Sequence, residues 1–145
     1  MLTGFEQQIT RLVLENCDLD NDHFRLLVES CKVLEHLNVA NNCLIDDYSP
    51  LRTHISPRIR VLKVGSKLGI ESQQIRSLSF TNALIDDIVQ SERCINLIHL
   101  QIQCLLTSKL VTLVTLPCLK RLTLKFICFS QISDSILSHE NDILH

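Results

Sequence analysis

Apolar residues recur along the chain in a short pattern that appears six times. In each copy two apolar residues are separated by one residue, and a third apolar residue stands three positions before the first of them. A period of two is typical of a strand with one buried face, because successive side chains point to opposite faces. We therefore predict a strand at each pair. The first residues of the six copies are Ile9, Leu34, Ile59, Ile75, Leu97 and Leu119.

The spacing of the copies predicts the architecture. Their starts lie 25, 25, 16, 22 and 22 residues apart, and structural repeats with a strand and a return segment usually take about 20 to 29 residues. Such a unit can bury its apolar side only against its neighbours. We predict one α/β domain over residues 1–145, a solenoid with a parallel sheet on its concave side and helices and loops on its convex side.

The segments between the predicted strands differ in their helical signals. Apolar residues at helical spacing follow the acidic stretch 20–22, which offers Asp and Asn as N-caps. Pro50 suits the first turn of a second helix, and Pro57 ends it. We predict helices over 24–31, 48–55 and 88–94, a return segment over 108–116, a loop over 66–74, a final helix over 132–137 and frayed residues over 139–145.

Cysteines occupy recurrent places in these copies. One motif is C-x-L after a strand, and another is a cysteine three residues before L-x-x-L. They stand here as Cys17-Asp-Leu19, Cys31-Lys-Val-Leu34-Glu-His-Leu37 and Cys94-Ile-Asn-Leu97-Ile-His-Leu100. On these residues the chain resembles the cysteine-containing subclass of leucine-rich repeat proteins, as found in F-box/leucine-rich repeat proteins.

The resemblance implies a protein-protein interaction module. In F-box proteins the repeats hold a substrate, while a separate F-box recruits a cullin-based ubiquitin ligase. Substrate recognition for such a ligase is therefore one expectation. The 145 residues hold no F-box ahead of the first repeat at Ile9, which counts against ligase recruitment by this chain. The alternatives are a scaffolding or regulatory repeat protein without a ligase link, and a structural subunit of a larger assembly.

The outward residues of the predicted strands form the candidate partner-binding surface, because solenoids use their concave face for extended contacts. His36 and His99 hold the same place in their copies. For any single residue, an ordinary hydrated sheet face is the simpler interpretation. The candidate residues are Arg11, Val13, Glu15, His36, Asn38, Lys63, Ser79, His99, Gln101, Arg121, Thr123 and Lys125.

Composition limits the other functions. The chain carries 14 Lys and Arg against 16 Asp and Glu, a formal net charge of −2. A general nucleic-acid binder usually has a basic footprint. Seven cysteines, an odd number, follow a start without a signal-peptide pattern, which favours reduced thiols in the cytoplasm or nucleus. The apolar stretches are too short to span a bilayer, so we expect a protein partner and neither nucleic acid nor membrane.

Two metal sites can be considered, and both have a simpler explanation. Asp18, Asp20, Asp22 and Glu29 match four positions of a calcium loop, but His23 stands where that loop needs glycine. The cysteines form no C-x-x-C pair. We expect buried core thiols at Cys17, Cys31 and Cys94, and fewer constraints on Cys104 and Cys128. No motif of a hydrolase, phosphate loop or metalloprotease appears, so we predict no enzyme, no cofactor and no metal.

Overall fold

A computed structural model describes residues 7–66, 78–127 and 138–144. Its single sheet has six strands in sequential order. The first five are parallel, and the sixth runs antiparallel to the fifth. This arrangement confirms the α/β class. The strands are β1 Arg11–Val13, β2 His36–Asn38, β3 Val61–Gly65, β4 His99–Cys104, β5 Arg121–Ile127 and β6 Ser138–Leu144.

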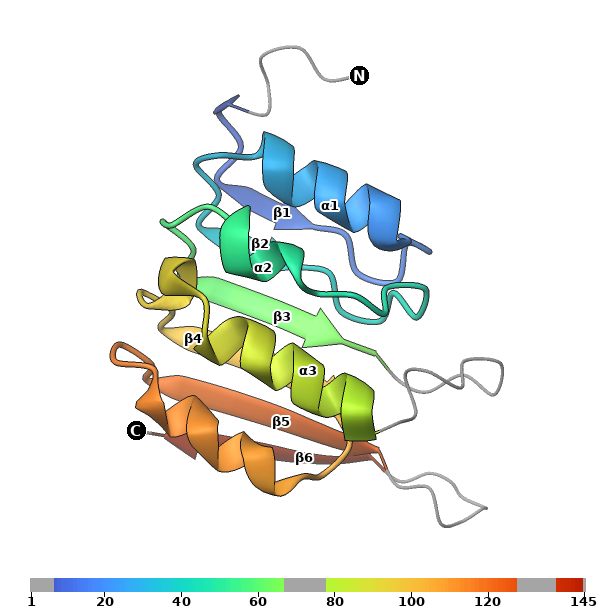
Figure 1. Ribbon diagram of the computed structural model, residues 1–145, viewed down its shortest axis with the longest axis vertical. Coiled ribbons are helices and arrows are strands. Elements are labelled where there is room, and N and C mark those ends of the chain that lie inside the picture. The colour runs from blue at the N-terminus through green and yellow to red at the C-terminus, as the bar shows by residue number, and fades with distance from the viewer. Residues whose placement is uncertain (1–6, 67–77, 128–137, 145) are drawn as a thin grey trace.

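The helical segments all lie on one face of the sheet, in front of it in Figure 1. We call this the helix-covered face, and we call the opposite one the open sheet face. Each return segment runs from the end of one strand back to the start of the next. The segments are α1 Asn21–Ser30, α2 Pro50–Thr53, α3 Leu78–Val89 and the 3₁₀ helices η2 Glu92–Cys94 and η3 Ser108–Thr115.

The core lies between the sheet and these helices. Leu37, Leu62, Leu100 and Leu122 face each other in register on β2 to β5 and are almost fully buried. Phe24 of α1 and Tyr48 pack edge to face below them, with ring centroids 5.1 Å apart. The apolar pairs of five of the six sequence copies therefore point where the alternation predicts.

The first helix begins as its sequence predicts. The Asp20 side chain accepts a hydrogen bond from the backbone N–H of His23 at 2.9 Å, and the Asp20 N–H donates to Nδ1 of His23 at 3.1 Å. These two bonds satisfy N–H groups that a helix start would leave unpaired. The acidic segment that matches part of a calcium loop thus serves as a helix cap.

The strand predicted at Leu78–Phe80 is wrong. These residues begin α3, and β3 pairs directly with β4. The buried residues Thr81, Leu84, Ile85 and Ile88 follow the helical period along α3, whereas Leu78 is half exposed. The copy at 75 therefore supplies no strand, and 38 residues separate the start of the copy at 59 from that of the copy at 97, whose strand pairs with β3.

The other predicted segments are partly confirmed. The helix predicted over 48–55 is present as the shorter α2, with Pro50 in its first turn, and 108–116 forms η3. Residues 88–94 are split between the end of α3 and η2. Residues 138–144 are not frayed, because β6 pairs along the whole of β5. The predicted loop over 66–74 lies, apart from Ser66, outside the described residues, as does the helix over 132–137.

The cysteines follow their place in the layers. Cys31, Cys94 and Cys104 are buried, and burial raises the pKa of Cys94 to about 11 and that of Cys104 to about 12. Both thiols therefore stay protonated near neutral pH. Cys17 is exposed, which corrects the expectation that it is a core residue. It follows β1, which is the first strand of the described sheet, so no earlier turn packs over it. Cys128 lies outside the described residues.

Candidate functional site

The strand register aligns the outward residues into rows across the open sheet face. Each row takes one residue from each parallel strand, and its members are register partners on neighbouring strands that lie about 4.8 Å apart. His36 and His99 share a row, with Val61 between them. The first row is Arg11, His36, Val61, His99 and Arg121, and the second is Val13, Asn38, Lys63, Gln101 and Thr123.

Ser79 does not belong to this surface. It lies in α3 on the helix-covered face, because the strand expected there is a helix. Thr81 lies in the same helix and is buried, and Ser77 is outside the described residues. The third strand of the sheet thus supplies Val61 and Lys63 next to His99 and Gln101, with no strand between them.

Two other candidate residues, Asn38 and Thr123, are buried within the fold. Asn38 donates from Nδ2 to Glu15 at 3.1 Å and accepts from the backbone N–H of Ala40 at 3.0 Å. The accessible part of the predicted set is therefore smaller. Arg11, Val13, Glu15 and Arg121 are exposed, and His36, Lys63, His99, Gln101 and Lys125 are partly exposed.

The open sheet face is cationic at both ends of its first row, with Arg11 on β1 and Arg121 on β5. Desolvation lowers the pKa of His36, and the charges of Arg11 and Lys63 lower it further. His36 is consequently mainly neutral at neutral pH and can both donate and accept a hydrogen bond. The face can thus offer hydrogen bonds from His36 and Gln101, flanked by positive charges.

A glycine at the end of β3 allows this strand to lie close against β4. Gly65 has a positive φ of 89°, and a Cβ built there would lie 2.2 Å from the carbonyl oxygen of Gln103 on the neighbouring strand. Its N–H donates to the hydroxyl of Tyr48 at 3.2 Å, and burial raises the pKa of that hydroxyl to about 12. A side chain at this position would push β3 and β4 apart.

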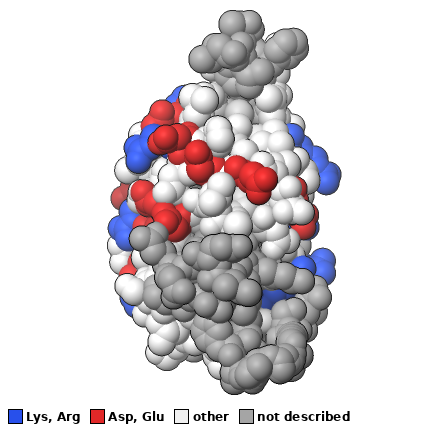
Figure 2. All heavy atoms as spheres, turned by 90° about the vertical axis from the view of Figure 1, so that its right-hand side faces the viewer, with Lys and Arg blue, Asp and Glu red and all other residues white. Residues whose placement is uncertain are grey.

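The two long edges of the sheet differ in charge. Figure 2 faces the edge where the parallel strands end, and acidic side chains gather over its upper half. The turns that follow β1 and β2 supply the acidic residues Glu15, Asp18, Asp20, Asp46 and Asp47. Negative charges near helix starts are stabilised by the helix dipole. The start of α1 therefore explains why some of the acidic residues lie at this edge.

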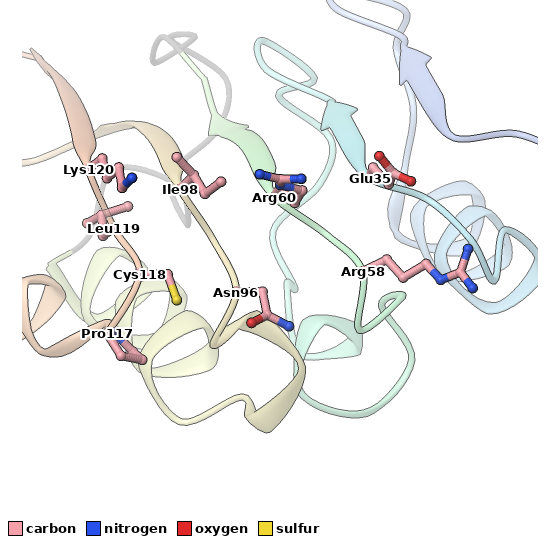
Figure 3. A pocket seen from close by; sticks show the side chains of 9 residues that line it. All are labelled: Glu35, Arg58, Arg60, Asn96, Ile98, Pro117, Cys118, Leu119 and Lys120. Carbon is pink, nitrogen blue, oxygen red and sulfur yellow. The ribbon is translucent and has the colours of Figure 1, made fainter.

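The opposite edge, where the parallel strands begin, contains a hollow that sequence reasoning missed (Figure 3). Its volume is about 840 Å³. The signal lay in the positions just before the first outward residue of each strand. Two of these positions hold Arg60 and Lys120, and they align only once the strands pair. The lining residues are Glu35, Arg58, Arg60, Asn96, Ile98, Pro117, Cys118, Leu119 and Lys120.

Within residues 7–66, 78–127 and 138–144, no three His, Cys, Asp or Glu side chains gather as they would around a metal ion. No helix in these parts of the chain has the length and apolarity to cross a bilayer.

No protein-family model, curated protein or solved structure matches the chain. Its function is therefore inferred from its residues and their geometry.

Proposed function

We propose that the chain is a leucine-rich repeat module that binds a partner protein on its open sheet face. The observation that carries the proposal is the in-register alignment of outward residues from five parallel strands, which makes one continuous surface. Substrate recognition for a ubiquitin ligase, scaffolding and a structural role in a larger assembly all remain predictions of this class.

A repeated backbone contact supports the repeat assignment. Just before each of the strands β2 to β5, one N–H donates to the carbonyl at the equivalent position before the preceding strand, at 2.8 Å. Repeat proteins stack equivalent units so that each contacts only its neighbours. The proposal counts five repeats, the third of which is lengthened by α3. The four bonds run from Glu35 to Thr10, Arg60 to Glu35, Ile98 to Arg60 and Lys120 to Ile98.

Side-chain contacts on the helix-covered face follow the same neighbour-to-neighbour order. Asn21 donates to Asp46 at 2.7 Å, and Arg52 pairs with Asp87 at 2.6 Å. The Ser91 hydroxyl donates to the carbonyl oxygen of Leu51 at 2.6 Å. These bonds join neighbouring return segments and involve no side chain of the open sheet face, which is compatible with a binding role for that face.

The chemistry of the open sheet face fits a protein ligand. Lys63 and Gln101 lie side by side in the second row and are partly exposed. Long polar side chains on a rigid sheet can contact backbone and side-chain groups of a partner without reorganising their own backbone. Val13 adds exposed apolar area at one end.

Site-directed photo-crosslinking would test this function. A photoreactive phenylalanine analogue at position 101 should crosslink a partner in cell extract, whereas the same analogue at position 53, exposed on α2, should not. Mass spectrometry would identify the adduct. The Lys63→Ala/Gln101→Ala variant should lose the partner, and the control Arg25→Ala/Thr53→Ala should retain it.

The controls decide between a binding face and a damaged fold. Circular dichroism should give both double variants the melting temperature of the parent chain. A partner that crosslinks equally from positions 101 and 53, or that binds the Lys63→Ala/Gln101→Ala variant normally, would overturn the assignment of the open sheet face.

A further inference from the structure

The hollow at the starting edge of the sheet is built from equivalent positions on neighbouring strands. At each of these positions the backbone N–H donates to the carbonyl oxygen of the equivalent residue before the preceding strand, at 2.8 Å. The bonds run from Arg60 to Glu35, from Ile98 to Arg60 and from Lys120 to Ile98. Glu35, Arg60, Ile98 and Lys120 therefore stand side by side, one strand apart, as Figure 3 shows.

The hollow joins an apolar floor to a charged rim. Leu119 is almost fully buried, and Ile98 is partly buried between Arg60 and Lys120. Arg58, two residues before Arg60, lines the hollow near the end that holds Glu35. Ligand pockets in proteins typically measure about 300 to 1,000 Å³, and this hollow of about 840 Å³ falls in that range.

The rim carries a surplus of positive charge. Arg58, Arg60 and Lys120 are exposed, and Glu35 is the one carboxylate among the described residues that line the hollow. Within the side chains that the structure describes, none of the three cations is in an ion pair.

Two cations on the helix-covered face are placed differently. Arg52 bonds to Asp87 and Lys109 bonds to Asp86, each at 2.6 Å. The rim cations, unlike these two, are available to an external anion.

We propose that this hollow binds an acidic segment of a partner protein. Its carboxylates contact Arg58, Arg60 and Lys120, and an apolar side chain between them covers Leu119. Arginine is suited to this task because its planar fork can donate two parallel hydrogen bonds to one carboxylate. The site is separate from the open sheet face and does not depend on the function proposed for it.

The arrangement of charges favours a peptide over the other anions. Arg58 and Arg60 precede β3 and Lys120 precedes β5, with Ile98 between the two groups. The cations therefore do not converge on one point, as they would around a single phosphate. Glu35 stands in the same row, where it repels a continuous polyanion and can accept a backbone N–H from a peptide. Among the described residues, the lining holds no aromatic side chain on which a nucleic-acid base could stack.

Fluorescence anisotropy with the full chain would test the proposal. The probe is a labelled decapeptide of alternating Glu and Leu, and its control carries Gln in place of Glu. The Glu peptide should bind, and added salt should weaken it. The Arg60→Gln/Lys120→Gln variant loses charged contacts, so the dissociation constant of the Glu peptide should rise by about tenfold or more. The control Arg25→Gln removes a positive charge on α1 and should change this dissociation constant by less than about twofold.

Four results would overturn the proposal. The Gln peptide could bind as well as the Glu peptide, or Arg60→Gln/Lys120→Gln could bind the Glu peptide unchanged. A single-stranded oligonucleotide could bind the hollow where the peptide does not. Sedimentation could show self-association that this variant abolishes, without peptide binding, which would make a second copy the occupant.

The open-face variant separates the two proposals. Lys63→Ala/Gln101→Ala should bind the Glu peptide normally. If it loses the peptide while Arg60→Gln/Lys120→Gln keeps it, the acidic ligand sits on the open sheet face. The hollow proposal then fails and the proposed function stands.

Discussion

The two faces of this sheet are made by alternate residues of the same strands, yet they have opposite chemistry. On the helix-covered face, Leu37, Leu62 and Leu100 are 0% exposed. On the open sheet face, their sequence neighbours His36, Lys63 and Gln101 are partly exposed. The buried apolar contacts are concentrated on the helix-covered face, so the side chains of the open sheet face contribute less to stability. Substitutions one residue apart should therefore have very different effects.

The largest effect is expected from the core row. Leu62→Ala leaves a cavity beneath α2 and α3 and should lower the free energy of unfolding by about 2 to 5 kcal/mol. Lys63→Ala, the next residue on the same strand, should change it by less than about 0.5 kcal/mol. Urea unfolding followed by circular dichroism measures both. Equal losses in the two variants would contradict the division between the faces.

The close approach of β3 and β4 is expected to come next. Gly65→Ala places a Cβ 2.2 Å from the Gln103 carbonyl oxygen and requires an unfavourable positive φ. Together these should cost about 2 to 4 kcal/mol.

Gly65→Asn separates the two causes, because asparagine tolerates positive φ better than alanine. Chemical denaturation of both variants would give their stabilities. If the contact dominates, Asn should destabilise at least as much as Ala. Full stability in the Asn variant would show that only φ matters.

A smaller loss is expected where one side chain joins the ends of β1 and β2. Asn42 donates to the carbonyls of Leu14 and Val39 at 2.9 and 2.8 Å. Its Oδ1 accepts from the N–H groups of Cys17 and Leu19. Asn42→Ala leaves these backbone N–H and C=O groups without their hydrogen-bond partner, so it should lower the free energy of unfolding by about 1 to 3 kcal/mol.

The neighbouring Cys43→Ala serves as its control, because no hydrogen bond of the Cys43 side chain joins these strands. Hydrogen exchange of the Cys17 and Leu19 amides would show whether the loss is local. Unchanged protection of these amides in Asn42→Ala would contradict the role given to this side chain.

The smallest effect is a pH dependence on the open sheet face. The pKa of His36 in the fold lies below its ordinary value of 6.5 because of desolvation, Arg11 and Lys63. The unfolded chain therefore binds the proton more tightly, so the contribution of neutral His36 to stability is present above pH 6.5 and is lost as pH falls through the lowered pKa.

An NMR titration of the His36 ring would measure this pKa directly. Arg11→Gln should raise it, because one of the nearby positive charges is removed. The matched Arg25→Gln on α1 should leave it unchanged. A ring that titrates at or above 6.5 in the parent chain would contradict the burial of His36 between its cationic neighbours.

Much of the fold could be predicted from local pattern. The alternation at residues 12 and 14, and again at 100 and 102, identified strands and the side that each buries. The acidic stretch before Phe24 identified the start of α1. These features are local, because period and capping depend on a few consecutive residues.

The errors share a physical cause. Leu78 and Phe80 have the spacing of a strand, but the buried residues at 81, 84, 85 and 88 have the period of a helix, and packing against Tyr48 and the sheet decided between them. Ser79 moved to the helix-covered face as a result. Asn38 was predicted to be a contact residue, but the turn after β1 brings Glu15 against it.

By itself, the sequence determined which residues of each strand point to the core, where the first helix starts and that His36 and His99 hold equivalent places. Only the tertiary structure decided that β3 pairs with β4 across 38 residues, which puts Arg60 beside Ile98 and Ile98 beside Lys120. The physical reason is that alternation is a property of neighbouring residues, whereas the hollow and the rows of the open sheet face are made by contacts between residues far apart in the chain.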